Sequence, residues 1–293
     1  MPTELDRLLS QIKCDTARNV AGLAPPPPKH AALYTGVEAM DDALREIYAS
    51  ENSTAPLLEL LGLPGSGKTQ TAYHITARAA LQGHSVLFID IDGKASPHAL
   101  AQHMGEDEEA LRRVHIFTPS STQALIATLA MLPKYAQHHG LPPGVLLVLD
   151  GLGSNYWADR KEALHVRVRS RRATPFFRLQ QLLVDSLHAV HRRLPCLTVA
   201  TSLLLLPALD SPDSPDALLT RVLGPQLEYR DHMIQRWSSV VTRSFVVDSR
   251  VENSLMRVTF TPLADRRRAR LYTAYIDNSG LHANTGIGSF TAN

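Results

Sequence analysis

The sequence predicts an α/β fold in which a mostly parallel central sheet is flanked by helices. Short apolar runs alternate with stretches of helical periodicity as far as residue 203, which favours a sheet wrapped by helices. Two of these runs, Val86–Ile91 and Val145–Leu149, are almost entirely apolar, as expected of strands buried on both faces. A glycine-rich loop joins a third run, Leu57–Leu61, to a helical pattern, which is the order of a phosphate-binding unit.

Composition narrows the class of protein. The chain has 293 residues, of which 44% are hydrophobic and 20% charged, values typical of a soluble globular protein. Its net charge of +2 is nearly neutral, so any contact with nucleic acid must come from a local patch. The two cysteines, Cys14 and Cys196, have no metal-ligand spacing, which favours a reducing, intracellular compartment. The apolar run Leu203–Leu206 is too short to span a bilayer, so we expect no membrane partner.

Two regions precede the first predicted strand. Residues 1–30 read as a leader, with a short amphipathic pattern at Glu4–Ile12 followed by the extended proline run Pro25–Pro28. A frayed tail is an equally good interpretation of this leader. Residues 31–293 form the predicted core, which begins with the segment TGVEAMDDAL and a helix that places Met40, Leu44 and Ile47 on one face.

The phosphate-binding motif is the strongest signal in the chain. The sequence GLPGSGKT has the P-loop spacing G-x-x-x-x-G-K-[ST], and the helix after it, Gln70 to Gln82, stops at Gly83. Backbone N–H groups of such a loop and the helix N-terminus bind phosphate. Lys68 is expected to reach the β- and γ-phosphates and Thr69 to bind Mg²⁺. The predicted nucleotide-binding residues are Gly62, Leu63, Pro64, Gly65, Ser66, Gly67, Lys68, Thr69 and Gln70.

Carboxylates follow two of the predicted buried strands. Asp150 ends the apolar run VLLVLD, the Walker B form in which an aspartate holds Mg²⁺, usually through water. Asp92 follows Val86–Ile91, at the carboxyl end where α/β sheets place their ligands. The sequence therefore predicts ATP and Mg²⁺ as cofactors, with Thr69 and Asp150 on the metal and Asp92 as a candidate base.

The remaining periodic segments complete the predicted core. Helices are expected at 97–104, 107–113, 122–132 and 176–193, and strands at 114–117 and 196–203. A last β-rich part, at 237–247, 255–260 and 270–276, is expected to extend the sheet.

Taken together, these motifs resemble the RecA-type recombinases of eukaryotes and their paralogues. The resemblance rests on TGVEAMDDAL, GLPGSGKTQ, TAYHITARA, VLFIDID and VLLVLDGLGSNYWADR, with RWSSVVTRSFVV and Asn278–Leu281 near the end, and covers roughly residues 31 to 282. It implies a RecA-like P-loop NTPase fold and a role in homologous-recombination repair of DNA double-strand breaks. It also implies a nuclear location, other recombinase paralogues as partners, and single-stranded or branched DNA bound through the complex.

Two positions and one segment depart from the family pattern. Active recombinases carry a catalytic glutamate where this chain has Asp92, and a polar sensor, usually glutamine, where it has Leu203. The second DNA-binding loop of the family corresponds to residues 204–224, which here are leucine-rich, then acidic and proline-rich. The resemblance therefore implies a DNA-dependent ATPase of weak or no activity that still binds nucleotide.

A basic segment matches the position of the first DNA-binding loop in the family. Between Asp159 and Arg172 two acidic residues face six basic ones, which could neutralise DNA phosphates: Arg160, Lys161, Arg167, Arg169, Arg171 and Arg172. A solvated charged loop explains the same residues equally well. A second cluster, Arg266–Arg270, is better explained as a solvated hairpin.

Two other functions stay open at this point. A P-loop small-molecule kinase would use the arginine-rich segment as a lid over the phosphates, with an acceptor pocket beside Asp92. A structural adaptor with a vestigial nucleotide site would bind no nucleotide at all.

Overall fold

The computed structural model describes residues 33–49, 55–159, 161, 175–203, 235–252, 255–262, 272–277 and 280–283. The predicted leader, residues 1–30, lies outside these ranges, so the proposed division of the chain stays a prediction. The helices are α3 (Glu38–Ala49), α4 (Lys68–Leu81), α5 (Pro97–His103), α6 (Glu108–Arg112), α7 (Thr122–His138), α9 (Pro175–Arg193) and the 3₁₀ helix η1 (Gln235–Ser239). The strands are β1 (Leu57–Gly62), β2 (Val86–Asp90), β3 (Val114–Phe117), β4 (Val145–Leu152), β5 (Cys196–Leu203), β6 (Arg243–Glu252), β7 (Leu255–Pro262), β8 (Tyr272–Asp277) and β9 (Gly280–Ala283).

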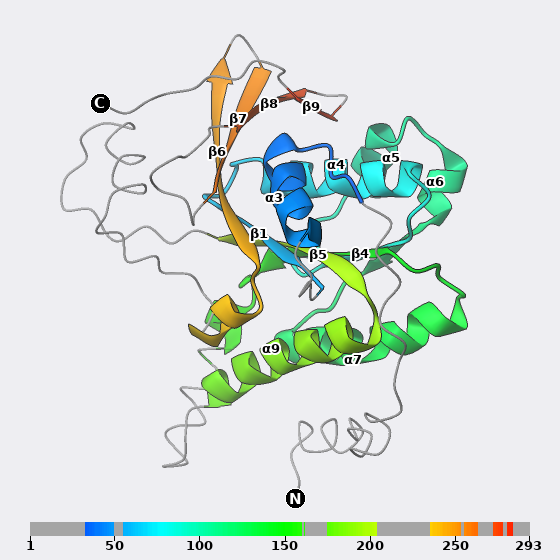
Figure 1. The fold of residues 1–293 in the computed structure, drawn as a ribbon. Coiled ribbons are helices and arrows are strands. Elements are labelled where there is room, and N and C mark those ends of the chain that lie inside the picture. The colour runs from blue at the N-terminus through cyan, green and yellow to red at the C-terminus, as the bar shows by residue number, and fades with distance from the viewer. Residues whose placement is uncertain are drawn as a thin grey trace, which may run out of the picture.

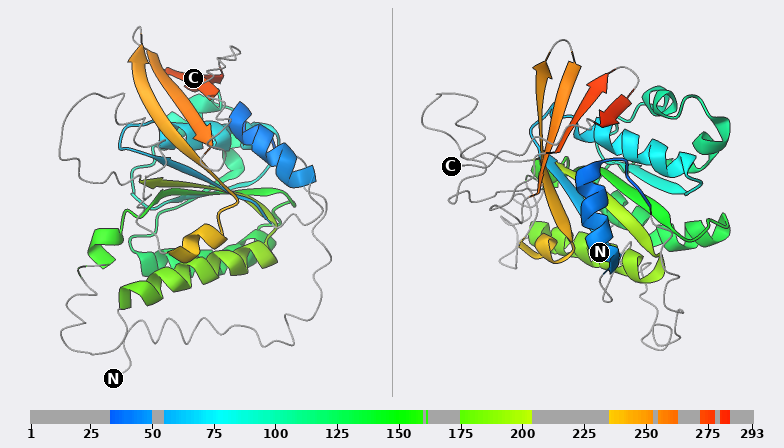
Figure 2. Two further views of the ribbon diagram at one scale, coloured as in Figure 1. Left: turned by 60° about the vertical axis from the view of Figure 1, so that its left-hand side comes forward. Right: turned by 45° about the horizontal axis from the view of Figure 1, so that its top comes forward.

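The described strands form one nine-stranded sheet in the order β3-β2-β4-β5-β1-β6-β7-β8-β9. Pairing is parallel from β3 to β6 and antiparallel from β6 to β9. Strands β6 and β7 project beyond the parallel part, as both views in Figure 2 show. The predicted mostly parallel sheet, extended by the C-terminal strands, is confirmed, and β9 adds a strand that the sequence did not predict.

Helices cover both faces of the parallel part, as the runs of apolar residues required. Figure 1 shows α3 to α6 on one face and the pair α7 and α9 on the other. Strand β1 has all six residues buried, with Leu58 and Leu60 in the core beneath α3 and α4 and Leu57 in the core with α7 and α9. The sheet thus separates two hydrophobic cores.

Two sequence predictions were wrong in their bounds. Helix α7 continues to His138, six residues past the predicted end, although Pro133 lies inside it. Leu129, Leu132 and Ala136 extend its buried apolar face across the proline, so packing outweighs the missing backbone donor. The predicted strand 237–247 begins instead with η1, because the buried Trp237 accepts backbone bonds from Val240 and Val241 in a turn.

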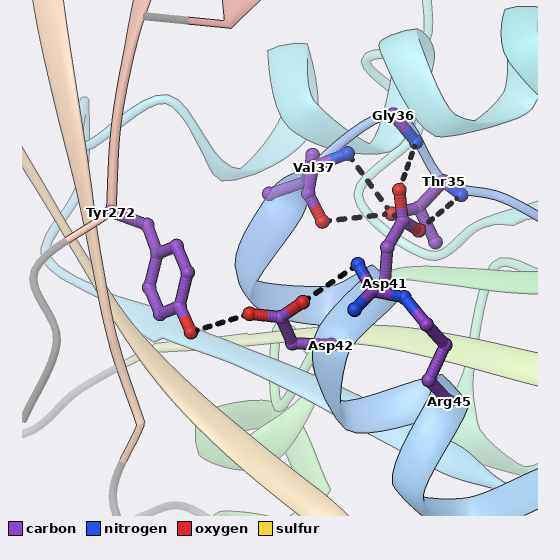
Figure 3. Close-up of polar contacts among 7 residues, drawn as sticks. All are labelled: Thr35, Gly36, Val37, Asp41, Asp42, Arg45 and Tyr272. Atoms are coloured by element: carbon purple, nitrogen blue, oxygen red, sulfur yellow. Dashed lines mark hydrogen bonds and ion pairs between the residues drawn. The ribbon is translucent and has the colours of Figure 1, made fainter. Parts of the chain in front are cut away.

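Helix α3 is tied down at its start and along its length (Figure 3). Asp41 accepts hydrogen bonds from Thr35 N at 2.7 Å, Thr35 Oγ1 at 2.7 Å and Gly36 N at 3.2 Å. Asp42 accepts from Tyr272 on β8 at 2.9 Å and pairs with Arg45 at 2.7 Å. Met40, Leu44 and Ile47 are buried on one face of the helix, as predicted. These contacts join the first described helix to one of the last strands.

Candidate nucleotide-binding site

The P-loop connects β1 to α4, and two of its glycines are required by geometry. A Cβ on Gly62 would lie 2.4 Å from both Ser66 Oγ and the Val247 carbonyl oxygen, so only glycine fits. Gly67 has φ 89°, and a Cβ there would lie 3.1 Å from the Ile276 side chain on β8. Gly67 occupies the N-cap of α4 and has no side chain to bond the first amides of the helix. Those N–H groups therefore remain available for an anion.

Lys68, the first residue of α4, folds its side chain back onto the P-loop. Its Nζ donates hydrogen bonds to the Gly62 carbonyl at 2.9 Å, the Leu63 carbonyl at 2.8 Å and Ser66 Oγ at 3.4 Å. Burial lowers the pKa of Lys68 to about 8, while the charges of Asp150 and Asp92 act in the opposite direction. The ammonium is thus held at the loop by neutral acceptors that a phosphate oxygen can replace.

Thr69 and Asp150 meet from different elements. Thr69 Oγ1 donates to Asp150 Oδ1 at 3.2 Å, and the same oxygen accepts from Thr201 Oγ1 on β5 at 2.6 Å. Burial raises the pKa of Asp150, the bonds from Thr201 and Thr69 lower it, and the charges of Asp90 and Asp92 raise it further. A hydroxyl and a carboxylate oxygen that converge on one point are hard ligands that suit Mg²⁺ with water completing its shell. The donor set therefore fits the predicted metal.

Asp92 lies beside this pair at the end of β2. A Cβ on Gly151, the residue after Asp150, would be 3.1 Å from Asp92 Cγ. The exposed Asp92 carboxylate lies 3.5 Å from Lys94 Nζ. The loop after it is held by Asp90, which accepts from Ala95 N at 2.7 Å, and by the Tyr73 hydroxyl, which accepts from Ser96 N at 2.8 Å. The structure thus brings the candidate base to the site, and its role stays a prediction.

The other predicted site residues divide between the loop and its surroundings. Leu63, Pro64 and Gly65 are exposed, and Ser66 is buried. The side chain of Gln70 contacts α5, with Oε1 at 3.1 Å from His103 Nε2. Leu203 pairs with Gly62 in the β1–β5 register, so the expected sensor position does lie next to the P-loop.

Sequence reasoning missed Thr201 and Ser249. Thr201 holds Asp150, and Ser249 Oγ on β6 donates to the Gly65 carbonyl at 3.2 Å. The signal for Thr201 was its place at the end of a strand parallel to β1, because the carboxyl ends of parallel strands share one edge. No comparable signal pointed to Ser249, which comes from the antiparallel part of the sheet.

The structure describes only the start of the basic segment, as far as residue 159, and residue 161. Lys161 is exposed, whereas Arg160, Arg167, Arg169, Arg171 and Arg172 lie outside the described residues. Trp157 is 65% exposed and its ring meets Tyr156 edge to face at 5.0 Å. Asp159 is buried and accepts a hydrogen bond from Thr122 Oγ1 at 2.6 Å. One of the two acidic side chains of the segment is therefore bound inside the protein.

Known proteins resemble the chain in sequence and in fold. No protein-family model matches the chain. The chain is 30% identical over 230 residues to DNA repair protein XRCC2 of Mus musculus. The alignment covers 72% of this chain and 79% of that protein. The crystal structure of the RadB recombinase aligns with a TM-score of 0.57 and 18% identity, over 86% of this chain and 99% of that chain. The second similarity shows the RecA-like fold predicted from the sequence.

Proposed function

Because the chain belongs to the family of RecA-type recombinase paralogues that includes DNA repair protein XRCC2, we propose that it binds Mg²⁺-ATP and assists homologous-recombination repair. It acts as one subunit of a complex with other recombinase paralogues, in the nucleus, and contacts single-stranded or branched DNA through that complex. Its ATPase activity is weak or absent.

One observation carries the nucleotide part of this proposal. The start of α4 supplies Lys68 and Thr69, the distant strand β4 supplies Asp150, and the three residues meet at the carboxyl end of β1. Asp150 is buried, its pKa is raised by burial, and it accepts from two hydroxyl donors. A buried carboxylate is costly, and a loop that no longer binds nucleotide does not explain it. This argument favours ATP binding over the vestigial adaptor.

The residues present account for binding better than for hydrolysis. Lys68 exchanges the carbonyls of Gly62 and Leu63 for phosphate oxygens, and the amides at the start of α4 complete the cradle. Thr69 and Asp150 would hold Mg²⁺, which neutralises the charge of the phosphates when it is bound. Asp92 is one methylene shorter than the family's glutamate, and a misplacement of about 1 Å can cost about a hundredfold in rate.

DNA contact is supported by the segment that begins at Tyr156. An exposed tryptophan on a short helix anchored by Asp159, next to Lys161, offers a flat surface for stacking a base beside positive charge. The buried Asp159 leaves Glu162 as the acidic residue facing the basic run in the sequence. A solvated loop would not need an anchored, exposed indole at its start.

Co-purification tests the proposal as a whole. The full chain, tagged and expressed in cells, is recovered from a nuclear extract and its partners are identified by mass. We expect recombinase paralogues in stoichiometric amounts. Recovery from nuclei with no paralogue at comparable yield would contradict the complex.

A further inference from the structure

A carboxylate lies buried in the middle of β1, three residues before the P-loop. Glu59 is 2% exposed and accepts hydrogen bonds from three neutral donors. Oε1 accepts from Trp237 Nε1 at 2.8 Å and Ser202 Oγ at 3.0 Å, and Oε2 accepts from Ser244 Oγ at 3.0 Å. Burial raises the pKa of Glu59, and these donors act in the opposite direction. Burying a carboxylate whose donors are all neutral is costly, so we look for a role of Glu59 beyond stability.

Its partner Ser202 is the neighbour of the residue that holds Asp150. Successive side chains of a strand point to opposite faces of the sheet. Ser202 therefore meets Glu59 on one face, whereas Thr201 donates to Asp150 Oδ1 at 2.6 Å on the other. Thr201 Oγ1 also accepts from Gly151 N at 2.8 Å. Two adjacent residues of β5 thus connect Glu59 to the carboxylate of the candidate metal site.

The pairing of β5 with its two neighbouring strands differs near Thr201. Strands β4 and β5 pair regularly up to Leu149 and Ala200, the register then shifts, and pairing resumes between Leu152 and Ser202. The irregularity falls at Asp150 and Gly151, opposite Thr201, so the ladder between β4 and β5 is interrupted where Thr201 meets that carboxylate. On the other side the β1–β5 register runs unbroken to Gly62 and Leu203. The regular ladder to β1, together with the bond from Ser202 to Glu59, therefore supports the end of β5 that carries Thr201.

We propose that Glu59 is a positioning residue for the metal side of the nucleotide site. Through Ser202 it fixes the end of β5, so that Thr201 keeps the Asp150 carboxylate aligned with Thr69. Glu59 Oε1, which accepts from Ser202 Oγ, also accepts from Trp237 Nε1. Binding of Mg²⁺-ATP at the site therefore changes the surroundings of that indole. This inference rests on the proposed binding of nucleotide.

The chain offers its own optical probe for this coupling. It has two tryptophans, Trp157, which is 65% exposed, and the buried Trp237. A Trp157→Phe background leaves Trp237 as the single indole. Its fluorescence reports directly on the carboxylate to which it donates.

Two serines provide a matched pair of variants in that background. Ser202→Ala and Ser244→Ala each remove one hydroxyl donor from Glu59, but only Ser202 lies next to Thr201. Mg²⁺ is titrated at fixed ATP, and both ATP binding and Trp237 emission are followed. We expect Ser202→Ala to raise the half-saturating Mg²⁺ concentration about threefold or more and to abolish the emission change, as loss of an outer-shell partner does at metal sites. Ser244→Ala should match the parent, and ATP binding without Mg²⁺ should be equal in all three proteins.

Equal Mg²⁺ dependence in the two serine variants would overturn the inference while leaving nucleotide binding intact. A purely structural contact would give that result, with similar losses in melting temperature for both variants. No binding of Mg²⁺-ATP by the parent would overturn the nucleotide site itself and this inference with it. Selective loss in Ser202→Ala establishes Glu59 and Ser202 as the support of the metal side.

Discussion

At the nucleotide site, the charge of one residue depends on pH close to neutrality. The pKa of Lys68 is lowered to about 8 by burial, and phosphate binding needs its protonated form. Above pH 8 the nucleotide-free protein must take up a proton to bind, so affinity for ATP should fall about tenfold per pH unit. Equilibrium binding between pH 7 and 9.5 measures this slope. The Lys68→Arg variant stays charged over this range, so its ATP affinity should not fall with pH. A constant affinity in the parent protein would contradict the lowered pKa.

A second residue links pH to stability on the far face of the sheet. His191 on α9 lies 2.8 Å from Thr198 Oγ1, and burial, with the nearby charge of His188, lowers its pKa from 6.5 to about 4. Between these values the unfolded state binds a proton that the folded state excludes, so stability falls as pH drops from 6.5 to 4. Allowing for partial exposure, the loss is about 2 kcal/mol. Chemical denaturation of the parent and of His191→Gln at both pH values tests this, since the variant should lack that part of the decline.

At the scale of elements, the positive charge of the basic segment after Tyr156 should affect both DNA affinity and its dependence on salt. Changing Arg167, Arg169, Arg171 and Arg172 to Ala should weaken DNA binding by the complex. It should also reduce the slope of log affinity against log salt by up to about four if each arginine contacts a phosphate. The matched control changes the other cluster, Arg266, Arg267, Arg268 and Arg270, to Ala and should leave both unchanged. Unaltered binding in the first variant would mean that the segment is only solvated.

The elements also show what a sequence can and cannot predict. The strands β1, β2, β4 and β5 were predictable because runs such as VLFID and VLLVLD are buried on both faces and leave no other interpretation. The turn at Trp237 and the continuation of α7 past Pro133 were not, because contacts from elements distant in sequence decide them. The same limit applied to the site. Lys68 and Thr69 follow from a local motif, whereas Thr201 and Glu59 acquire their roles from neighbouring strands.

At the scale of the whole molecule, the nucleotide site faces outward. Leu63 in the P-loop is 39% exposed, as is Ile116 on the edge strand β3. The resemblance to RecA-type recombinases implies that nucleotide lies between neighbouring subunits, and apolar groups at such a position become buried on association. We expect the isolated chain to be poorly soluble and to form a stable heteromer when another paralogue is added, as measured by light scattering after gel filtration. A stable monomer at micromolar concentration, indifferent to an added paralogue, would contradict this.

The described part of the chain has no helix that is long and apolar enough to cross a membrane. The nine-stranded sheet brings the P-loop, Asp150 and Asp92 together at the carboxyl ends of its parallel strands.

Binding of Mg²⁺-ATP without appreciable hydrolysis is tested by measuring binding and turnover together. Calorimetric binding and phosphate release are recorded on the same preparations of the parent, Lys68→Ala, Asp92→Asn and, as a control, Lys134→Ala, which changes an exposed lysine on α7. We predict measurable affinity in the parent, the control and Asp92→Asn, loss of binding in Lys68→Ala, and phosphate release near background in all four. Robust hydrolysis by the parent that disappears in Asp92→Asn, or unchanged binding in Lys68→Ala, would contradict it.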